Sequence, residues 1–184
     1  MIGLIFCEEK LLSKALMDKS GLAYVFCAFD TMSTLGMPIF LSVSSNQIDA
    51  YKTIFDPKKI IAVKGAIADE EHLHALLEVH IKYPAENILA LSCSMPLIEM
   101  QLLERLCIVS KTHEEYDAYF FTNNDESEYL CGIYSSKVLA SIMDLHLGMK
   151  SDRQMLEAIM RRQNCYFVPL EHNEKQYFKK FNND

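Results

Sequence analysis

The sequence predicts a three-layer α/β protein with a mostly parallel sheet and an antiparallel hairpin insertion. Three observations support this fold class. Strand-like apolar runs alternate with amphipathic segments through the first two thirds of the chain. The run at residues 88–91 (ILAL) has no polar alternation, which is typical of a strand covered on both faces. Two β-rich runs, 116–121 and 129–134, are joined by a polar stretch that suits a hairpin.

The remaining elements follow from the spacing of apolar residues and from capping signals. The other expected strands are residues 1–7, 39–43, 59–63 and 165–170. The expected helices are residues 22–32, 46–55 with Asn46 as its cap, 69–83, 98–109, 135–147 and 151–163, the last opening on a capping box. The chain shows no internal repeat or linker, so a single domain over residues 1–184 is expected.

Composition narrows the function classes. The net charge of −7 argues against a general binder of nucleic acid or of anionic membranes, because such proteins are basic. The six cysteines are widely scattered with no Cys-x-x-Cys pair, which indicates thiols in a reducing compartment. No apolar run has the length of a transmembrane helix, and the short apolar start lacks the features of a signal peptide. A cytoplasmic protein without nucleic-acid or membrane partners is therefore expected.

Four segments in this order resemble motifs of the MobA-like NTP transferase family, whose namesake is molybdenum cofactor guanylyltransferase. Residues 13–22 (SKALMDKSGL) are similar to the family's Asp-Lys-x-Leu-Leu-x-x-x-Gly segment. Residues 91–96 (LSCSMP) resemble its Cys-Asp-x-Pro strand end, which holds the metal. Residues 129–134 (YLCGIY) and 178–182 (FKKFN) are similar to its Pro-Leu-x-x-x-Tyr strand and its closing Phe-x-Asn-x-Asn motif. The order and spacing match over nearly the whole chain.

The resemblance implies a Rossmann-like fold of the nucleotide-diphospho-sugar transferase type. It also implies nucleotidyl transfer from GTP to molybdopterin with magnesium, so a nucleotide and a molybdopterin-like small molecule are the expected ligands. Lys14 and Asn182 would be the nucleotide-binding residues, and Ser94 occupies the position of the family's metal ligand. From its residue type alone, Lys14 is either a phosphate-binding point charge or a solvated surface lysine.

The chain departs from the family at the residues that carry the chemistry. Residues 7–12 (CEEKLL) contain no glycine where the family has a phosphate-binding loop, and Glu8 and Glu9 would repel a triphosphate. Residues 71–75 (EHLHA) lack the glycines of the family's Gly-Pro-Leu-x-Gly turn. Ser94 replaces the aspartate, and a neutral hydroxyl is a poor ligand for a hard cation such as Mg²⁺. These departures predict weak or absent catalysis.

Three functions are left open by these observations. The chain is an active transferase of the molybdenum cofactor type, a non-catalytic relative that binds a molybdopterin-like ligand or a protein partner, or a nucleotidyltransferase for another phosphorylated or sugar-acid substrate. The non-catalytic hypothesis is favoured, because a fold does not fix a function.

Cys93 is expected to be a buried structural thiol. A zinc site at His72 and His74 is disfavoured, because the two diverge by about 200° on a helix.

Overall fold

The computed structural model describes residues 1–7, 20–63, 68–123, 126–146, 160 and 163–178. Its strands are β1 (Ile2–Cys7), β2 (Ile39–Ser44), β3 (Ile60–Val63), β4 (Ile88–Ser92), β5 (Ala118–Asn123), β6 (Glu126–Tyr134) and β7 (Cys165–Pro169). Its helices are α2 (Ser20–Ser33), α3 (Ile48–Lys52), α4 (Ala68–Lys82), α5 (Met100–Thr112) and α6 (Ser136–His146), with two 3-10 turns, η1 (Pro57–Lys59) and η2 (Lys175–Phe178).

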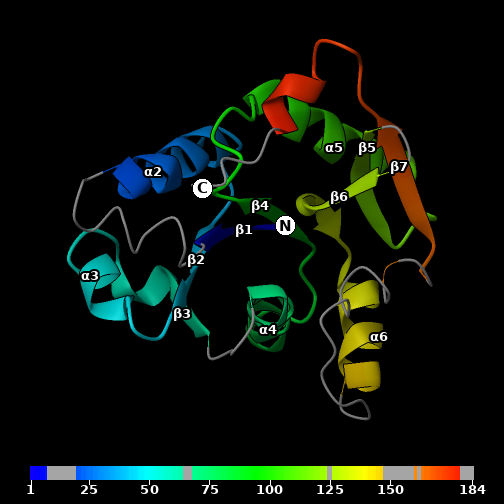
Figure 1. Ribbon diagram of the computed structural model, residues 1–184. Helices are drawn as coiled ribbons and strands as arrows, with labels where there is room; N and C mark the ends of the chain where they lie inside the picture. Colours follow the sequence, from blue (N-terminus) through cyan, green and yellow to red (C-terminus); the bar gives the residue numbers. More distant parts are fainter. Residues whose placement is uncertain (8–19, 64–67, 124–125, 147–159, 161–162, 179–184) are drawn as a thin grey trace.

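The strands form one seven-stranded sheet in the order β3-β2-β1-β4-β6-β5-β7 (Figure 1). All neighbouring pairs are parallel except those of β6, which runs antiparallel to both β4 and β5. The predicted fold class is therefore confirmed. The hairpin places one reversed strand, β6, inside an otherwise parallel sheet.

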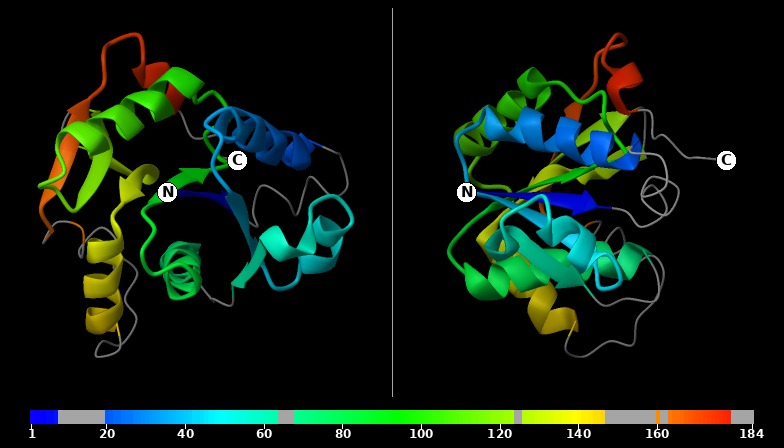
Figure 2. Two further views of the ribbon diagram at one scale, coloured as in Figure 1. Left: turned by 180° about the vertical axis from the view of Figure 1, so that it is seen from behind. Right: turned by 90° about the vertical axis from the view of Figure 1, so that its left-hand side faces the viewer.

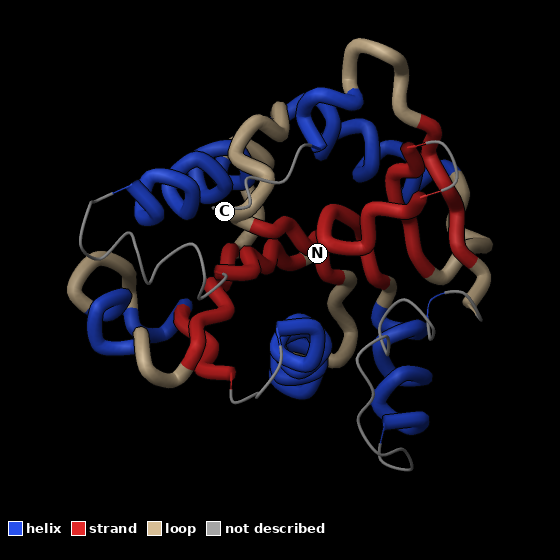
Figure 3. The backbone as a smooth tube through the Cα atoms, in the orientation of Figure 1, coloured by secondary structure: helices blue, strands red, loops and turns tan. Residues whose placement is uncertain are grey.

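Helices cover both faces of the sheet, which gives three layers (Figures 2 and 3). The helices α2 and α5 lie on one face, and their buried side chains form a core with the sheet: Val25, Ala28, Met32, Leu102, Leu103 and Leu106. The helices α4 and α6 lie on the other face and contribute a second core: Leu73, Leu76, Leu77, Val138, Leu139 and Ile142. The predicted central strand at residues 88–91 is completely buried between these two layers.

The strand order reverses at β1, and this reversal positions the candidate site. The chain passes from β1 to β2 on one side and reaches β4 on the other side, both in parallel register. In open α/β sheets, ligands bind beyond the carboxyl ends of the strands at such a switch point. The carboxyl ends of β1 and β4, at Cys7 and Ser92, meet there, because Phe6 pairs with Ser92.

Two local predictions are wrong in detail. The short helix after β2 spans only Ile48–Lys52, and its N-cap residue is Gln47, not Asn46. The hairpin stretch at residues 122–127 is mostly strand, because Thr122 pairs with Ser127 and Asn123 pairs with Glu126. The predicted helix at 151–163 lies almost entirely outside the described residues. Among the described helices, none is both long and apolar enough to cross a membrane.

An ion pair joins α5 to the residue that precedes η2. The guanidinium of Arg105 donates to both carboxylate oxygens of Glu174 at 2.8 and 2.9 Å, and the guanidinium carbon lies 5.0 Å from the centre of the Phe121 ring. Burial on its own would raise the pKa of Glu174, but the hydrogen bonds from Arg105 and from the backbone N–H of Glu171 outweigh it and lower that pKa. The folded state therefore holds this carboxylate in its charged form.

Glu174→Gln is expected to lower the free energy of unfolding at pH 7 by about 2 kcal/mol, the usual worth of hydrogen bonds to a charged group. The pKa of Glu174 is lower in the folded chain than its ordinary value of 4.5, so the contribution is complete above that value and is lost as pH falls below it. Urea unfolding between pH 7 and 3 should show a shallower acid decline for the variant. Asp49→Asn is the control, because its pair with Lys52 is 3.9 Å long and exposed. Equal acid slopes for Glu174→Gln and the wild type would contradict this account.

Candidate functional site at the carboxyl ends of β1 and β4

Ser94 lies in a tight turn that closes the end of β4. The backbone N–H of Met95 donates to the carbonyl of Ser92 at 3.2 Å, and the N–H of Ser94 donates to Ser92 Oγ at 3.0 Å. The two hydroxyls are hydrogen-bonded to each other at 2.7 Å. Ser92 is fully buried and Ser94 is 3% exposed. The hydroxyl in the expected metal position is thus neutral, buried and bonded to its own strand.

The described residues around this turn do not fit a magnesium ion. Mg²⁺ requires carboxylate oxygens and keeps several waters in an octahedral shell. The turn offers two buried hydroxyls, and no group of three or more His, Cys, Asp or Glu side chains that could hold a metal occurs among the described residues. Glu8, Glu9, Lys14 and Asn182 lie outside the described residues.

Tyr51 of α3 is a buried phenol beside the end of β1. It is 2% exposed, and its hydroxyl bonds to no nitrogen or oxygen of the described residues. Burial raises its pKa far above the ordinary value, and the nearby thiols of Cys7 and Cys93 raise it further. The phenol therefore stays neutral at every physiological pH.

Two amide oxygens at the same edge of the sheet have no hydrogen-bond partner in the described part of the chain. Gln47, which follows β2, is 6% exposed and its Oε1 is unpaired. Asn123 ends β5, and its Oδ1 is also unpaired. An unsatisfied buried acceptor costs free energy, so a ligand N–H or O–H would bind favourably at either oxygen. Three strands separate β2 from β5, so the two oxygens are distinct contact points.

Two histidines of α4, His72 and His80, are buried. His72 is 7% exposed and its ring centre lies 4.6 Å from that of Phe6. His80 is 3% exposed, and burial lowers its pKa, which favours the neutral imidazole. Cys93 is fully buried, as predicted. His80 thus presents a neutral imidazole to the interior.

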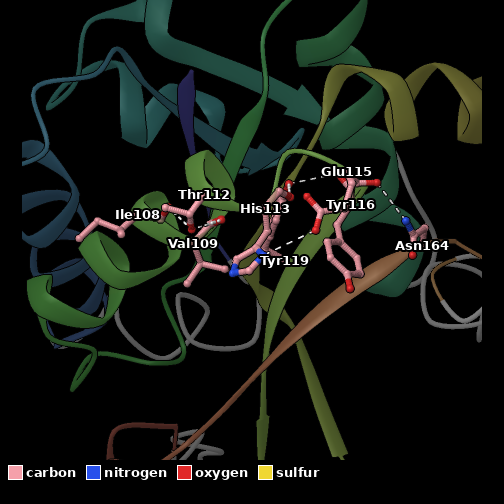
Figure 4. A network of polar contacts seen from close by, with 8 residues as sticks. All are labelled: Ile108, Val109, Thr112, His113, Glu115, Tyr116, Tyr119 and Asn164. Atoms are coloured by element: carbon pink, nitrogen blue, oxygen red, sulfur yellow. Dashed lines mark hydrogen bonds and ion pairs between the residues drawn. The ribbon is translucent and has the colours of Figure 1, made fainter.

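A hollow lies at the opposite, amino edge of the parallel strands. It has a volume of about 390 Å³ and is lined among others by Asn87, Tyr116, Asp117 and Lys137. Asp117 and Lys137 form an ion pair at 2.7 Å. Figure 4 shows a polar network beside this hollow, in which the hydroxyl of Tyr119, a lining residue, donates to the carbonyl of His113 at 2.6 Å. These hydrogen bonds join the end of α5 to the start of β5, so they have a structural role.

The sequence pattern brings Ser92, Cys93 and Ser94 to the carboxyl edge, and the structure places them there. Gln47 and Tyr51 are not singled out by any motif. A glutamine and a tyrosine in an amphipathic segment look like surface residues, and only the packing of α3 against β2 and β3 shows that they are buried.

No protein-family model matches the chain, and no curated protein matches it in sequence. Solved structures do match. Molybdopterin-guanine dinucleotide biosynthesis protein A from Archaeoglobus fulgidus superposes with a TM-score of 0.69 at 15% identity, covering 99% of this chain and 92% of that one. The 4-diphosphocytidyl-2C-methyl-D-erythritol synthase of Anaerococcus prevotii gives a TM-score of 0.65 at 15% identity, covering 98% and 89%.

A third match is Rv0371C of Mycobacterium tuberculosis, solved in complex with manganese, with a TM-score of 0.66 at 13% identity over 92% of this chain and 87% of that one. At such identities the likeness shows the fold alone. The chain has the α/β fold that these solved structures share.

Proposed function

We propose that the chain is a non-catalytic relative of the nucleotidyltransferases. It binds a small nitrogen-bearing ring ligand, a nucleotide or a pterin, at the carboxyl ends of β1 and β4. It does not transfer nucleotides with magnesium. The observation that carries the proposal is the buried hydrogen bond between Ser92 and Ser94, a neutral pair that includes the residue aligned by sequence resemblance with the family's metal ligand.

Electrostatics support the loss of transfer chemistry. Nucleotidyl transfer depends on neutralising the charge that develops on the transferred phosphate, and a bound metal ion supplies most of that neutralisation. Two hydroxyls bonded to each other offer no compensating charge for such an ion. Among the described residues, no other cluster of ligands replaces them.

Retained ligand binding is supported by the polar atoms left unpaired at this edge. Gln47 Oε1 is buried beyond the end of β2 and accepts no hydrogen bond from the described residues. Nucleobases and pterins carry ring N–H and amino groups that are suited to such an acceptor. The sheet below the site is intact, since β1 and β4 pair from Ile2–Ile88 to Phe6–Ser92.

Isothermal titration calorimetry of the whole chain with GTP, CTP and a soluble pterin tests the proposal, with and without magnesium. At least one ligand is expected to bind with an affinity that magnesium does not change, and no pyrophosphate should be released from the nucleotides when molybdopterin is added. Gln47→Leu should weaken that binding at least tenfold. Magnesium-dependent micromolar binding of GTP would overturn the non-catalytic part of the proposal. The absence of a heat of binding for all three ligands would overturn the binding part.

A further inference from the structure

Cys7 and Cys93 stand at the adjacent carboxyl ends of the paired strands β1 and β4. Cys7 is the last residue of β1, and Cys93 follows the end of β4. The parallel register of β1 and β4 ends at the pair Phe6–Ser92, where the backbone N–H of Cys93 donates to the carbonyl of Phe6 at 3.0 Å, and Cys7 and Cys93 are the next residues on the two chains. The ladder therefore makes Cys7 and Cys93 neighbours, although 85 residues separate them in the sequence.

Their side chains also lie on the same face of the sheet. Successive side chains of a strand alternate between faces, and Cys7 and Cys93 share one core cluster with Ile5 and Leu91, which pair two positions earlier. The Tyr51 hydroxyl is close enough to both thiols for each to raise its pKa. Neighbouring strands are about 4.8 Å apart, which falls within the Cα separation of about 4.4–6.8 Å that a disulfide spans.

We propose that Cys7 and Cys93 form a reversible disulfide when the chain meets hydrogen peroxide. Cys7, which is 5% exposed against 0% for Cys93, is oxidised first. Its thiolate sulfur attacks one peroxide oxygen, the O–O bond breaks, and a sulfenic acid and water result. The Cys93 sulfur then attacks the Cys7 sulfur and displaces the oxygen as a second water. In total, two thiols and one peroxide give one disulfide and two waters.

The geometry makes this disulfide easy to reduce. Directly opposed residues of parallel strands hold their Cβ atoms near the strand spacing of about 4.8 Å, whereas a relaxed disulfide brings them to about 3.8 Å. A strained disulfide has a higher reduction potential and belongs to the labile class. The bond would join the ends of β1 and β4 one residue before Ser94. It is thus a redox modification at the candidate site, and it does not depend on the function proposed above.

Peptide mapping of the peroxide-treated native chain tests the inference. After graded peroxide, the remaining thiols are alkylated in urea and the chain is digested without reductant. The expected product is a Cys7–Cys93 linked peptide with loss of two of the six thiols, both regained with dithiothreitol. Cys93→Ser should abolish the linkage and leave a sulfenic acid at Cys7 that dimedone traps. Cys27→Ser, which removes an exposed thiol of α2, should leave the linkage unchanged.

The inference fails if Cys7 and Cys93 stay fully alkylatable at peroxide levels that oxidise Cys27, or if Cys7 joins a different cysteine. A second measurement uses the unmutated chain, so it does not depend on a variant folding. Phenylarsine oxide bridges two close thiols, and one equivalent should protect both Cys7 and Cys93 from alkylation after unfolding while Cys27 stays reactive. Protection of neither thiol would show that the two sulfurs do not lie side by side.

Discussion

Gly132→Ala is expected to lower the free energy of unfolding by about 3 kcal/mol or more, since the new methyl group overpacks a rigid part of the core. Gly132 lies in the middle of β6 and pairs with Ala90 on one side and Phe120 on the other. A Cβ atom there would stand 2.2 Å from Phe120 Cδ1 and 2.7 Å from the carbonyl oxygen of Tyr119. The second contact is with backbone, which can move only by distorting β5.

The Phe120 ring has little room to retreat. It is fully buried and meets the rings of Tyr129 and Tyr134 edge-on, at centroid distances of 5.0 and 5.1 Å. Gly3→Ala is the matched control, because its nearest contact is the Sδ of Met32 at 2.7 Å, the end of a flexible side chain. Urea unfolding should show a clearly larger loss for Gly132→Ala than for Gly3→Ala. Similar losses at both sites would contradict the packing at Phe120.

Ser94→Asp is expected to lower the free energy of unfolding by about 3 kcal/mol without magnesium, because it places an unpaired carboxylate in a buried site. Ser94 is 3% exposed, and its hydroxyl bond to Ser92 would be replaced by a charged group. If this position corresponds to the family's metal ligand, magnesium should bind the folded variant and raise its melting temperature. The wild type should show no such rise.

Ser94→Asn is the control for this experiment, because asparagine matches aspartate in size and carries no charge. Thermal unfolding at increasing magnesium concentration compares the three chains. The account predicts a concentration-dependent rise in melting temperature for Ser94→Asp alone. If magnesium affects the aspartate and asparagine variants equally, the correspondence between Ser94 and the metal position is wrong.

The sheet could be predicted from sequence where burial is complete. The run at 88–91 is apolar throughout because helices cover both faces of β4. An unbroken apolar run predicts a strand that is buried on both faces. The outer end of the hairpin is different. Thr122, Asn123, Glu126 and Ser127 pair as strand although they are polar, because their backbones extend a ladder begun by buried residues. Strand propensity depends on such neighbours, which a local pattern does not contain.

Fewer residues of the candidate site than of the sheet could be predicted from the sequence, for a related reason. The residues of the site come together because of the order of the strands and the packing of α3, and not because of their spacing along the chain. Cys7 and Cys93 become neighbours only because β1 lies beside β4. Gln47 and Tyr51 become buried only because α3 packs on β2 and β3. The motif at 91–96 predicted which edge of the sheet carries the site. Only tertiary packing shows which other side chains lie there.

The most direct test of the central claim is the calorimetric titration of GTP into the unmodified chain with and without magnesium. The Ser92–Ser94 hydrogen bond leaves two neutral hydroxyls at this site, and no cluster of three or more metal-binding side chains occurs among the described residues, so magnesium should leave the GTP isotherm unchanged. A GTP affinity in the micromolar range that appears only with magnesium would contradict the account and identify the chain as a metal-dependent nucleotide-binding protein.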